Sequence, residues 1–417
     1  MKKKILPIIF SLTILATSIY AGGFQINEHG ARAMAMAGAF TAIANDASAI
    51  YFNPAGITQL KGTNFYGGLT LIAPSASFTG PAPSTTKTDM DSQTFTPINF
   101  YVTQQIGDNL FVGLSVNNQY GLGTRWPVNW PGKYLAYDTE IKSFFFTPVV
   151  AYKFSNQFSL SAGLVIAYGD VKIIQVSNVG AGDFQTELKG NKTSVGFSAG
   201  LMYKPSNEFS IGVSYRSSVK WDLEGTAKST PEGFTHPLLK VFIPYPKGDV
   251  TAPLKTPQNI TVGLGYMPTD QLTLAADFQY VGWSSYDKLS ITFKNYNVSN
   301  PLAPGPSTES VDRNYENTFI IRGGAEYNLS DVFALRAGIL YDRNPVKTEY
   351  VEPTLPDANR IGLNIGFGYK LTNNLSIDVA YMFLSFSDRD VTGSKFGFNG
   401  KYTNNAHLVG ADLSLAL

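Results

Sequence analysis

One short motif in the chain has the spacing of a hydrolase nucleophile. Gly196, Ser198 and Gly200 match the Gly-x-Ser-x-Gly pattern, in which a serine on a strand-to-helix turn attacks a carbonyl carbon with the help of a histidine. Here Phe197 and Ala199 continue an alternation of side chains that is typical of a strand. We therefore expect Ser198 to lie in the middle of a strand, without a catalytic role.

Histidine and cysteine, which often carry out nucleophilic catalysis or bind transition metals, are scarce. The chain has three histidines and no cysteine. His29, His236 and His407 lack metal-ligand spacing, and none has an obvious nucleophile beside it. We therefore expect no cofactor, no metal and no enzymatic activity. The enzymatic alternative is a lipase or protease site at an outer rim, built around His236 or His407.

Charged residues occur singly along segments in which apolar and polar positions alternate. By this alternation, one polar face carries Arg216, Asp277, Glu326, Arg336, Asp378 and Asp412. A charge that faced the centre of a bilayer would cost about 2–4 kcal/mol, so an inward lattice of ion pairs is the simplest interpretation. Arg216 and Lys220 are the two basic residues that we consider as partners for a carboxylate ligand.

The segments that carry these charges have the length and pattern of membrane-crossing strands. Every second residue is apolar in 158–168 and again in 272–280, and such alternation over about 10 residues suits a tilted strand in a bilayer. Short polar turns follow at 107–109, 155–157, 205–208, 268–271, 328–331 and 372–374. With a first strand near 64–72 and a last strand near 407–417, these six hairpins predict about 14 strands.

The two ends of the predicted strands differ. Long polar connections are expected near 74–94, 118–141, 170–192, 218–256, 284–317, 343–359 and 385–405. Tyrosines precede five of the short turns, at Tyr152, Tyr203, Tyr266, Tyr327 and Tyr369, where a ring can lie at a membrane interface. Short turns on one side and long loops on the other are typical of an antiparallel outer-membrane barrel.

Composition supports an exported membrane barrel. Charged residues make up 15% of the chain and aromatic residues 13%, against roughly 25% charged residues in soluble proteins. Residues 1–21 are expected to be a signal peptide, with three lysines at 2–4 and an apolar run from 5 to 16. Its removal leaves 29 Lys+Arg (32 less 3) against 31 Asp+Glu. This balance gives no electrostatic basis for binding nucleic acid.

The stretch that follows the signal peptide differs from the predicted strands. Residues 30–44 consist mainly of small side chains with helix-compatible spacing, and such side chains pack closely in a confined space. We therefore expect an all-β membrane protein with a helical plug, or hatch, inside the barrel. The expected divisions are 1–21 for the signal peptide, 22–61 for the hatch and 62–417 for the transmembrane barrel.

Several segments resemble one known family. Residues 23–29 and 46–56, which include Asn53-Pro54-Ala55, resemble the start of mature long-chain fatty acid transporters of the outer membrane. That family (OMPP1/FadL/TodX) also includes aromatic-hydrocarbon channels. Further matches lie at 120–126, 214–220, 283–286, 335–338, 341–342 and 355–360. The resemblance spans nearly the whole mature chain in order.

The resemblance implies a 14-stranded barrel in which a hydrophobic ligand passes from an outer site to a pocket and leaves sideways at a kinked third strand. By position, it implies a pocket residue at Phe24 and a hatch turn at Asn53, Pro54 and Ala55, and we expect these residues to form a gate that rearranges when ligand binds. It also implies a kink at Asn118, Gln119, Tyr120 and Gly121. The alternation does break after Val116, and Gly121 suits a bend. One departure is the C-terminal Leu417, where an aromatic residue is usual, so the assembly signal is expected to differ.

We therefore predict passive uptake of hydrophobic small molecules, principally long-chain fatty acids, across a bacterial outer membrane. Uptake of aromatic hydrocarbons or other small apolar compounds is the alternative within the same class. A structural or adhesive barrel would leave the hatch unexplained. The expected surroundings are outer-membrane lipid and lipopolysaccharide, with insertion by the barrel assembly machinery, and the protein is expected to act as a monomer.

Overall fold

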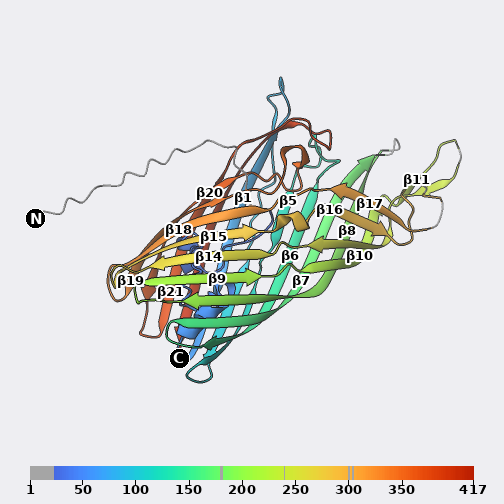
Figure 1. The fold of residues 1–417 in the computed structure, drawn as a ribbon. Coiled ribbons are helices and arrows are strands. Elements are labelled where there is room, and N and C mark those ends of the chain that lie inside the picture. Colours follow the sequence, from blue (N-terminus) through green and yellow to red (C-terminus); the bar gives the residue numbers. More distant parts are fainter. Residues whose placement is uncertain (1–22, 179–181, 239, 299–300, 303–304) are drawn as a thin grey trace, which may run out of the picture.

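The chain forms a closed antiparallel β-barrel of fourteen strands (Figure 1). This computed structural model describes residues 23–178, 182–238, 240–298, 301–302 and 305–417. The fold confirms the predicted all-β barrel and its strand number. The expected signal peptide lies outside the described residues.

Within the described residues, no helix combines the length and the apolar character that crossing a membrane would require.

Several of the fourteen strands are interrupted and continue as a second piece. Around the barrel they are β1 (Thr63–Thr79), β3 (Ile98–Gln105), β4 (Leu110–Asn117) with β5 (Gly121–Arg125), β6 (Asp138–Lys153), β7 (Phe158–Asn178), β8 (Asp183–Tyr203), β9 (Phe209–Arg216) with β10 (Lys220–Thr230), β13 (Gly248–Lys255) with β14 (Asn259–Tyr266), β15 (Leu272–Val281) with β16 (Lys288–Phe293), β17 (Ser307–Asp312) with β18 (Thr318–Asn328), β19 (Phe333–Asp342), β20 (Arg360–Lys370), β21 (Leu375–Phe386) with β22 (Arg389–Val391), and β23 (Gly400–Ala416). The barrel closes where β23 pairs with β1, from Asn64 opposite Ala416 to Thr79 opposite Lys401.

The six predicted short turns all connect neighbouring strands, as between β3 and β4 or between β20 and β21. The five tyrosines that precede turns are 39–43% exposed on the outer surface of the barrel. In β6 the outward Phe144 and Phe146 flank the buried Phe145. This alternation places apolar side chains on the surface that faces lipid.

The predicted long connections are partly wrong, because several of them continue as strands. β7 and β8 pair from Phe158 opposite Tyr203 to Asn178 opposite Asp183, so most of the expected loop at 170–192 is sheet. The expected loops at 218–256 and 284–317 likewise contain β10, β13, β16 and β17. Beyond the bilayer an outward side chain need not be apolar, so the alternation becomes weaker although the strand pairing continues. For the same reason β1 and β23 are longer than predicted.

Residues 23–62, here called the N-terminal segment, lie within the barrel (Figure 1, blue). The segment contains α1 (Ala31–Ala35), α2 (Ala49–Phe52) and the 3-10 helix η1 (Pro54–Gln59). Helix α1 contacts β19, β20, β21 and β23, whereas η1 contacts β4, β6, β7 and β8. The segment therefore touches opposite parts of the wall. Small side chains permit this fit, since a Cβ added to Gly324 would lie 2.5 Å from the carbonyl oxygen of Met36.

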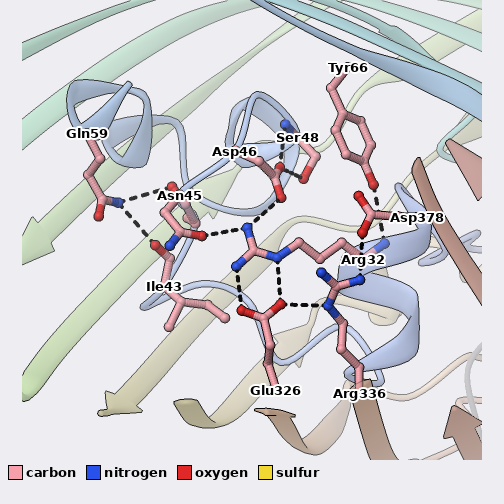
Figure 2. Close-up of polar contacts among 11 residues, drawn as sticks. Arg32, Ile43, Asn45, Asp46, Ser48, Gln59, Tyr66, Glu326, Arg336 and Asp378 are labelled. Carbon is pink, nitrogen blue, oxygen red and sulfur yellow. Dashed lines mark hydrogen bonds and ion pairs between the residues drawn. The ribbon is translucent and has the colours of Figure 1, made fainter. Parts of the chain in front are cut away.

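A network of buried charges fixes α1 to the wall (Figure 2). Arg32 makes two parallel hydrogen bonds of 2.9 Å to Glu326 and a 3.2 Å ion pair with Asp46. Glu326 also accepts a 2.6 Å bond from Arg336, whose guanidinium binds Asp378 at 2.6 Å. The side chains in this network are between 6% and 16% exposed. The ion pair between Arg32 and Glu326 thus joins the segment to the barrel, and Arg336 links Glu326 to Asp378 within the wall.

Two further inward carboxylates bind backbone amides of the segment. Asp277 Oδ2 accepts from the amides of Phe40 and Thr41 at 3.1 and 3.0 Å. Asp412 Oδ2 accepts from the amide of Ala31 at 2.5 Å. Each of these contacts satisfies a backbone donor that would otherwise be buried without a partner.

Candidate ligand-binding site

Phe24 lies at the centre of a cluster of aromatic rings. Its ring is 4% exposed, and its centroid lies 4.8 Å from that of Trp283, 5.8 Å from Tyr286 and 5.9 Å from Tyr120, all edge to face. Tyr315 packs against both Trp283 and Tyr286. Edge-to-face contacts favour such rings beyond their burial in an apolar environment. Phe24 is therefore held in one position by its neighbours.

The aromatic cluster forms where the barrel strands are interrupted. Tyr120 lies between β4 and β5, Trp283 and Tyr286 lie in or beside the 3-10 helix η2 (Trp283–Ser285) between β15 and β16, and Tyr315 lies between β17 and β18. At an interruption the side chains no longer need to alternate between the two faces of the sheet. This lets consecutive parts of the wall turn large rings toward the lumen.

Two cavities meet at Phe24. The smaller holds about 90 Å³ and is lined mainly by apolar side chains from β6, β7, β8, β10, β13 and β16. The larger holds about 620 Å³ and is lined by residues 23–26 and, at the strand interruption, by Asn118, Tyr120 and the adjoining Gly121. Its lining also includes Ile98 and Phe144, whose side chains are exposed on the outer surface. The larger cavity thus extends from Phe24 to the lipid-facing side of the wall.

The N-terminal segment is hydrogen bonded to this interruption. The amide of Ile26 donates to the carbonyl of Gln119 at 2.9 Å, and the amide of Gly121 donates to the carbonyl of Phe24 at 3.0 Å. The side chain of Asn118 closes the wall locally. Its NH2 group donates to the backbone carbonyl of Ser143 at 2.6 Å, and its carbonyl oxygen accepts from the backbone amide of Ile98. Residues 24–26 thus replace the wall's own strand pairing beside Gly121.

Asp357 holds the start of the described chain and was not singled out from the sequence. Its Oδ2 accepts a 2.6 Å hydrogen bond from the amide of Gly23. Burial raises the pKa of Asp357 to about 7, although Arg360 and the Gly23 amide favour the ionised form.

Trp283, Tyr286 and Tyr315 were also missed as site residues. Gly282, which precedes the interruption, is the sequence signal that could have indicated Trp283 and Tyr286.

The turn at Asn53, Pro54 and Ala55 lies away from Phe24 and lines neither of its cavities. Asn53 is completely buried, and its amide group donates to the carbonyls of Thr41 and of Leu201 in β8 at 3.0 and 2.9 Å. Its side-chain carbonyl accepts from the amide of Ala55. The turn therefore ties two parts of the segment to the wall.

The two basic candidates have different surroundings. Arg216 donates to the carbonyl of Tyr51 at 2.7 Å and lies over the Tyr51 ring, beside Arg322 in a polar cavity of about 20 Å³. Lys220 points out of the barrel, with its side chain 57% exposed and 2.8 Å from Asp222. The structure does not support Lys220 as a carboxylate partner, because its neighbour Trp221 takes the inward position.

Neither the serine motif nor the histidine of the segment forms a reactive group. Ser198 lies within β8 opposite Arg216 of β9, as its alternating neighbours indicated. Burial and the nearby Arg216 lower the pKa of His29 to about 3, so its ring is neutral. His29 Nε2 lies 3.0 Å from the carbonyl oxygen of Ile26.

The sequence matches proteins of one kind along almost its whole length. A family model described as "Outer membrane protein transport protein (OMPP1/FadL/TodX)" matches residues 12–416. The "Putative outer membrane protein NMB0088" of Neisseria meningitidis is 24% identical, over 98% of this chain and 97% of that protein. The "Long-chain fatty acid transport protein" of Escherichia coli K12 is 24% identical, over 97% of each chain.

Solved structures share the fold at lower identity. A FadL homologue of Pseudomonas aeruginosa aligns with a TM-score of 0.80 and 21% identity, over 95% of this chain and all of that one. The toluene transporter TodX of P. putida aligns with a TM-score of 0.74 and 15% identity, over 94% of this chain and 99% of that one.

Proposed function

Since the chain belongs to the outer membrane protein transport protein family (OMPP1/FadL/TodX), we propose that it takes up hydrophobic molecules passively, with long-chain fatty acids as its principal substrates. The protein is an outer-membrane transporter of hydrophobic substrates, and not an enzyme. Relatives named as long-chain fatty acid transport proteins support the choice of substrate. The channel lies within one chain, which is consistent with a monomer.

The position of Phe24 between the two cavities carries the proposal. The smaller, apolar cavity lies on one side of Phe24, and the larger cavity on its other side reaches the outer surface of the wall. A ligand in the smaller cavity can reach the larger one when residues 24–26 move. It then leaves between β3 and β5 without crossing water, which is the main barrier to an apolar solute.

The energies of two exit routes favour this sideways path. A route straight through the segment would have to break the buried network around Arg32 and Glu326, and breaking one buried pair costs about 3–5 kcal/mol. A route at the strand interruption requires loss of the bonds made by Ile26 and Gly121, each worth about 0.5–1.5 kcal/mol. We therefore propose that the part of the segment near Asn53 stays fixed while residues 23–28 move.

Aromatic hydrocarbons are the second candidate substrate. The rings around Phe24 form a site in which a small aromatic ligand could replace the Phe24 ring edge to face. A structural neighbour is a toluene transporter. Both candidates use the same cavities and the same exit.

The test is uptake of labelled oleate by cells that lack their own fatty acid transporter, with and without this protein at matched surface levels. We expect saturable uptake that depends on the protein. Competition with toluene ranks the two substrate classes. A correctly folded barrel that takes up toluene but no oleate would reject fatty acids as the principal substrates. Uptake of neither compound would contradict the proposed function.

A further inference from the structure

The smaller cavity beside Phe24 has almost entirely apolar walls. Val171, Ile173, Leu188, Leu223 and Leu254 line it from the extended part of the barrel. Lys189 also borders the cavity, but its side chain is 56% exposed and binds Glu187 at 2.8 Å. Lys189 therefore offers no free cation to a ligand inside.

One ion pair lies in the wall of this cavity. Arg313, between β17 and β18, binds Glu352, which follows the 3-10 helix η3 (Thr348–Tyr350). Their side chains are 10% and 11% exposed, and the Thr354 hydroxyl donates to the same carboxylate. The formal charges of the pair cancel. The cavity thus contains a cation that is already neutralised by a carboxylate of the protein.

This pairing penalises a ligand carboxylate. The ligand would have to displace Glu352 from Arg313, share the guanidinium with Glu352 through the unpaired Nε, or remain without any cation. Each arrangement buries one more negative charge than the single cation can neutralise, which is strongly unfavourable. An uncharged apolar group has no such penalty and gains the full benefit of burial.

We infer that Glu352 sets the charge preference of this cavity, which takes an uncharged apolar group and rejects a carboxylate. Accordingly, an aromatic hydrocarbon enters whole, whereas a fatty acid enters tail first with its carboxylate left outside this cavity. The inference rests on the proposed function, because it assumes that the cavity holds the transported ligand.

The test compares two ligands of similar shape and different charge. We would measure the dissociation constants of 4-fluorotoluene and 4-fluorobenzoate by fluorine NMR at pH 7.5, with the full-length processed protein in nanodiscs and empty nanodiscs as the blank. The wild type should bind 4-fluorotoluene at least about tenfold more tightly. In Glu352→Gln the affinity for 4-fluorobenzoate should rise about tenfold or more, because Arg313 is then free to bind the ligand carboxylate through charge-assisted hydrogen bonds.

Two control variants separate the role of Glu352 from general effects of charge. The double variant Arg313→Met with Glu352→Met should keep the preference for 4-fluorotoluene and gain no affinity for 4-fluorobenzoate. Glu224→Gln makes the same change in an exposed pair with Lys192 and should alter neither constant.

The outcomes distinguish the inference from the proposed function. Wild-type protein that binds both ligands equally, or a folded Glu352→Gln that gains no affinity for 4-fluorobenzoate, overturns the inference but leaves the cavity as a ligand site. Binding of neither ligand by the wild type overturns the assignment of the cavity and the inference with it. The wild-type comparison needs no variant, so the inference stays testable if Glu352→Gln does not fold.

Discussion

The amide of Gly23 donates a 2.6 Å hydrogen bond to Asp357, a buried carboxylate in the connection between β19 and β20. This bond fixes the backbone next to Phe24 and so helps to hold the Phe24 ring between the two cavities. Asp357 thus connects the proposed gate to the barrel wall.

Uptake should increase as pH falls through the pKa of Asp357. Burial raises this pKa to about 7, and the Gly23 amide favours the ionised form. Protonation below pH 7 therefore weakens the bond to Gly23 and eases movement of Phe24. Uptake of toluene, which does not titrate, should rise by up to about tenfold between pH 8 and pH 6. In Asp357→Asn the profile should be flat, and an equal rise in this variant would contradict the role of Asp357.

Gly23→Ala should reduce uptake about tenfold. Gly23 has a φ of +66°, and an added Cβ would lie 2.4 Å from Cζ2 of Trp283. An L-residue in this conformation costs about 1–2 kcal/mol, and the clash displaces either Phe24 or Trp283. The measurement is ligand uptake at matched surface levels. Gly107→Ala is the control, since a Cβ there meets nothing within 4 Å. Equal uptake by both variants would show that the aromatic cluster is not needed.

Asn53→Ala should lower uptake without lowering the yield of folded barrel. The change leaves the buried carbonyls of Thr41 and Leu201 without their donor, at a cost of about 1–3 kcal/mol each. The strand ladders remain intact, so the barrel still assembles, but the fixed part of the segment loses an anchor and no longer positions residues 23–28 against the strand interruption. Yield is measured by the heat-dependent shift of the folded barrel on gels. Uptake equal to that of the wild type at equal yield would exclude Asn53 from the mechanism.

Glu326→Gln should destabilise the folded protein by about 3 kcal/mol or more, because Arg32 and Arg336 both lose a buried charged partner. The midpoint of urea unfolding in lipid vesicles measures this effect. Glu224→Gln, in the exposed pair with Lys192, should leave the midpoint almost unchanged. Equal midpoints for the two variants would mean that the network does not anchor α1.

The sequence predicted the barrel well because strand alternation is a local pattern. The turns at 107–109 and 372–374 lie between strands as expected. The alternation of side chains along the strand was enough to predict that Glu326 points inward. The extended parts of β7 and β8 were missed because their outward residues face water and need not be apolar. Where the solvent changes, alternation of apolar and polar residues no longer marks the strand.

The candidate site was less predictable because its residues come together only in the closed barrel. Phe24 and Asp357 are both near Gly23 in space, yet more than three hundred positions separate them in sequence. Lys220 lies on the outer face because the strand is interrupted at residues 217–219, which shifts the alternation so that Trp221 points inward. Such a break changes which residues of the strand point inward, and the alternation that precedes the break does not predict the new positions.

A reversible lock between Gln25 and Tyr120 tests the proposed movement of residues 23–28 most directly. These residues form an isolated antiparallel bridge, and the flanking bonds of Ile26 and Gly121 make them a closely spaced, non-hydrogen-bonded pair. Such a pair suits a disulfide, and the chain has no other cysteine. The measurement is uptake of labelled oleate by the double variant Gln25→Cys with Tyr120→Cys, before and after reduction. We predict little uptake when the disulfide is formed and recovery on reduction, with the single variants insensitive to reductant. Equal uptake in the oxidised and reduced states would contradict a gate at this strand interruption.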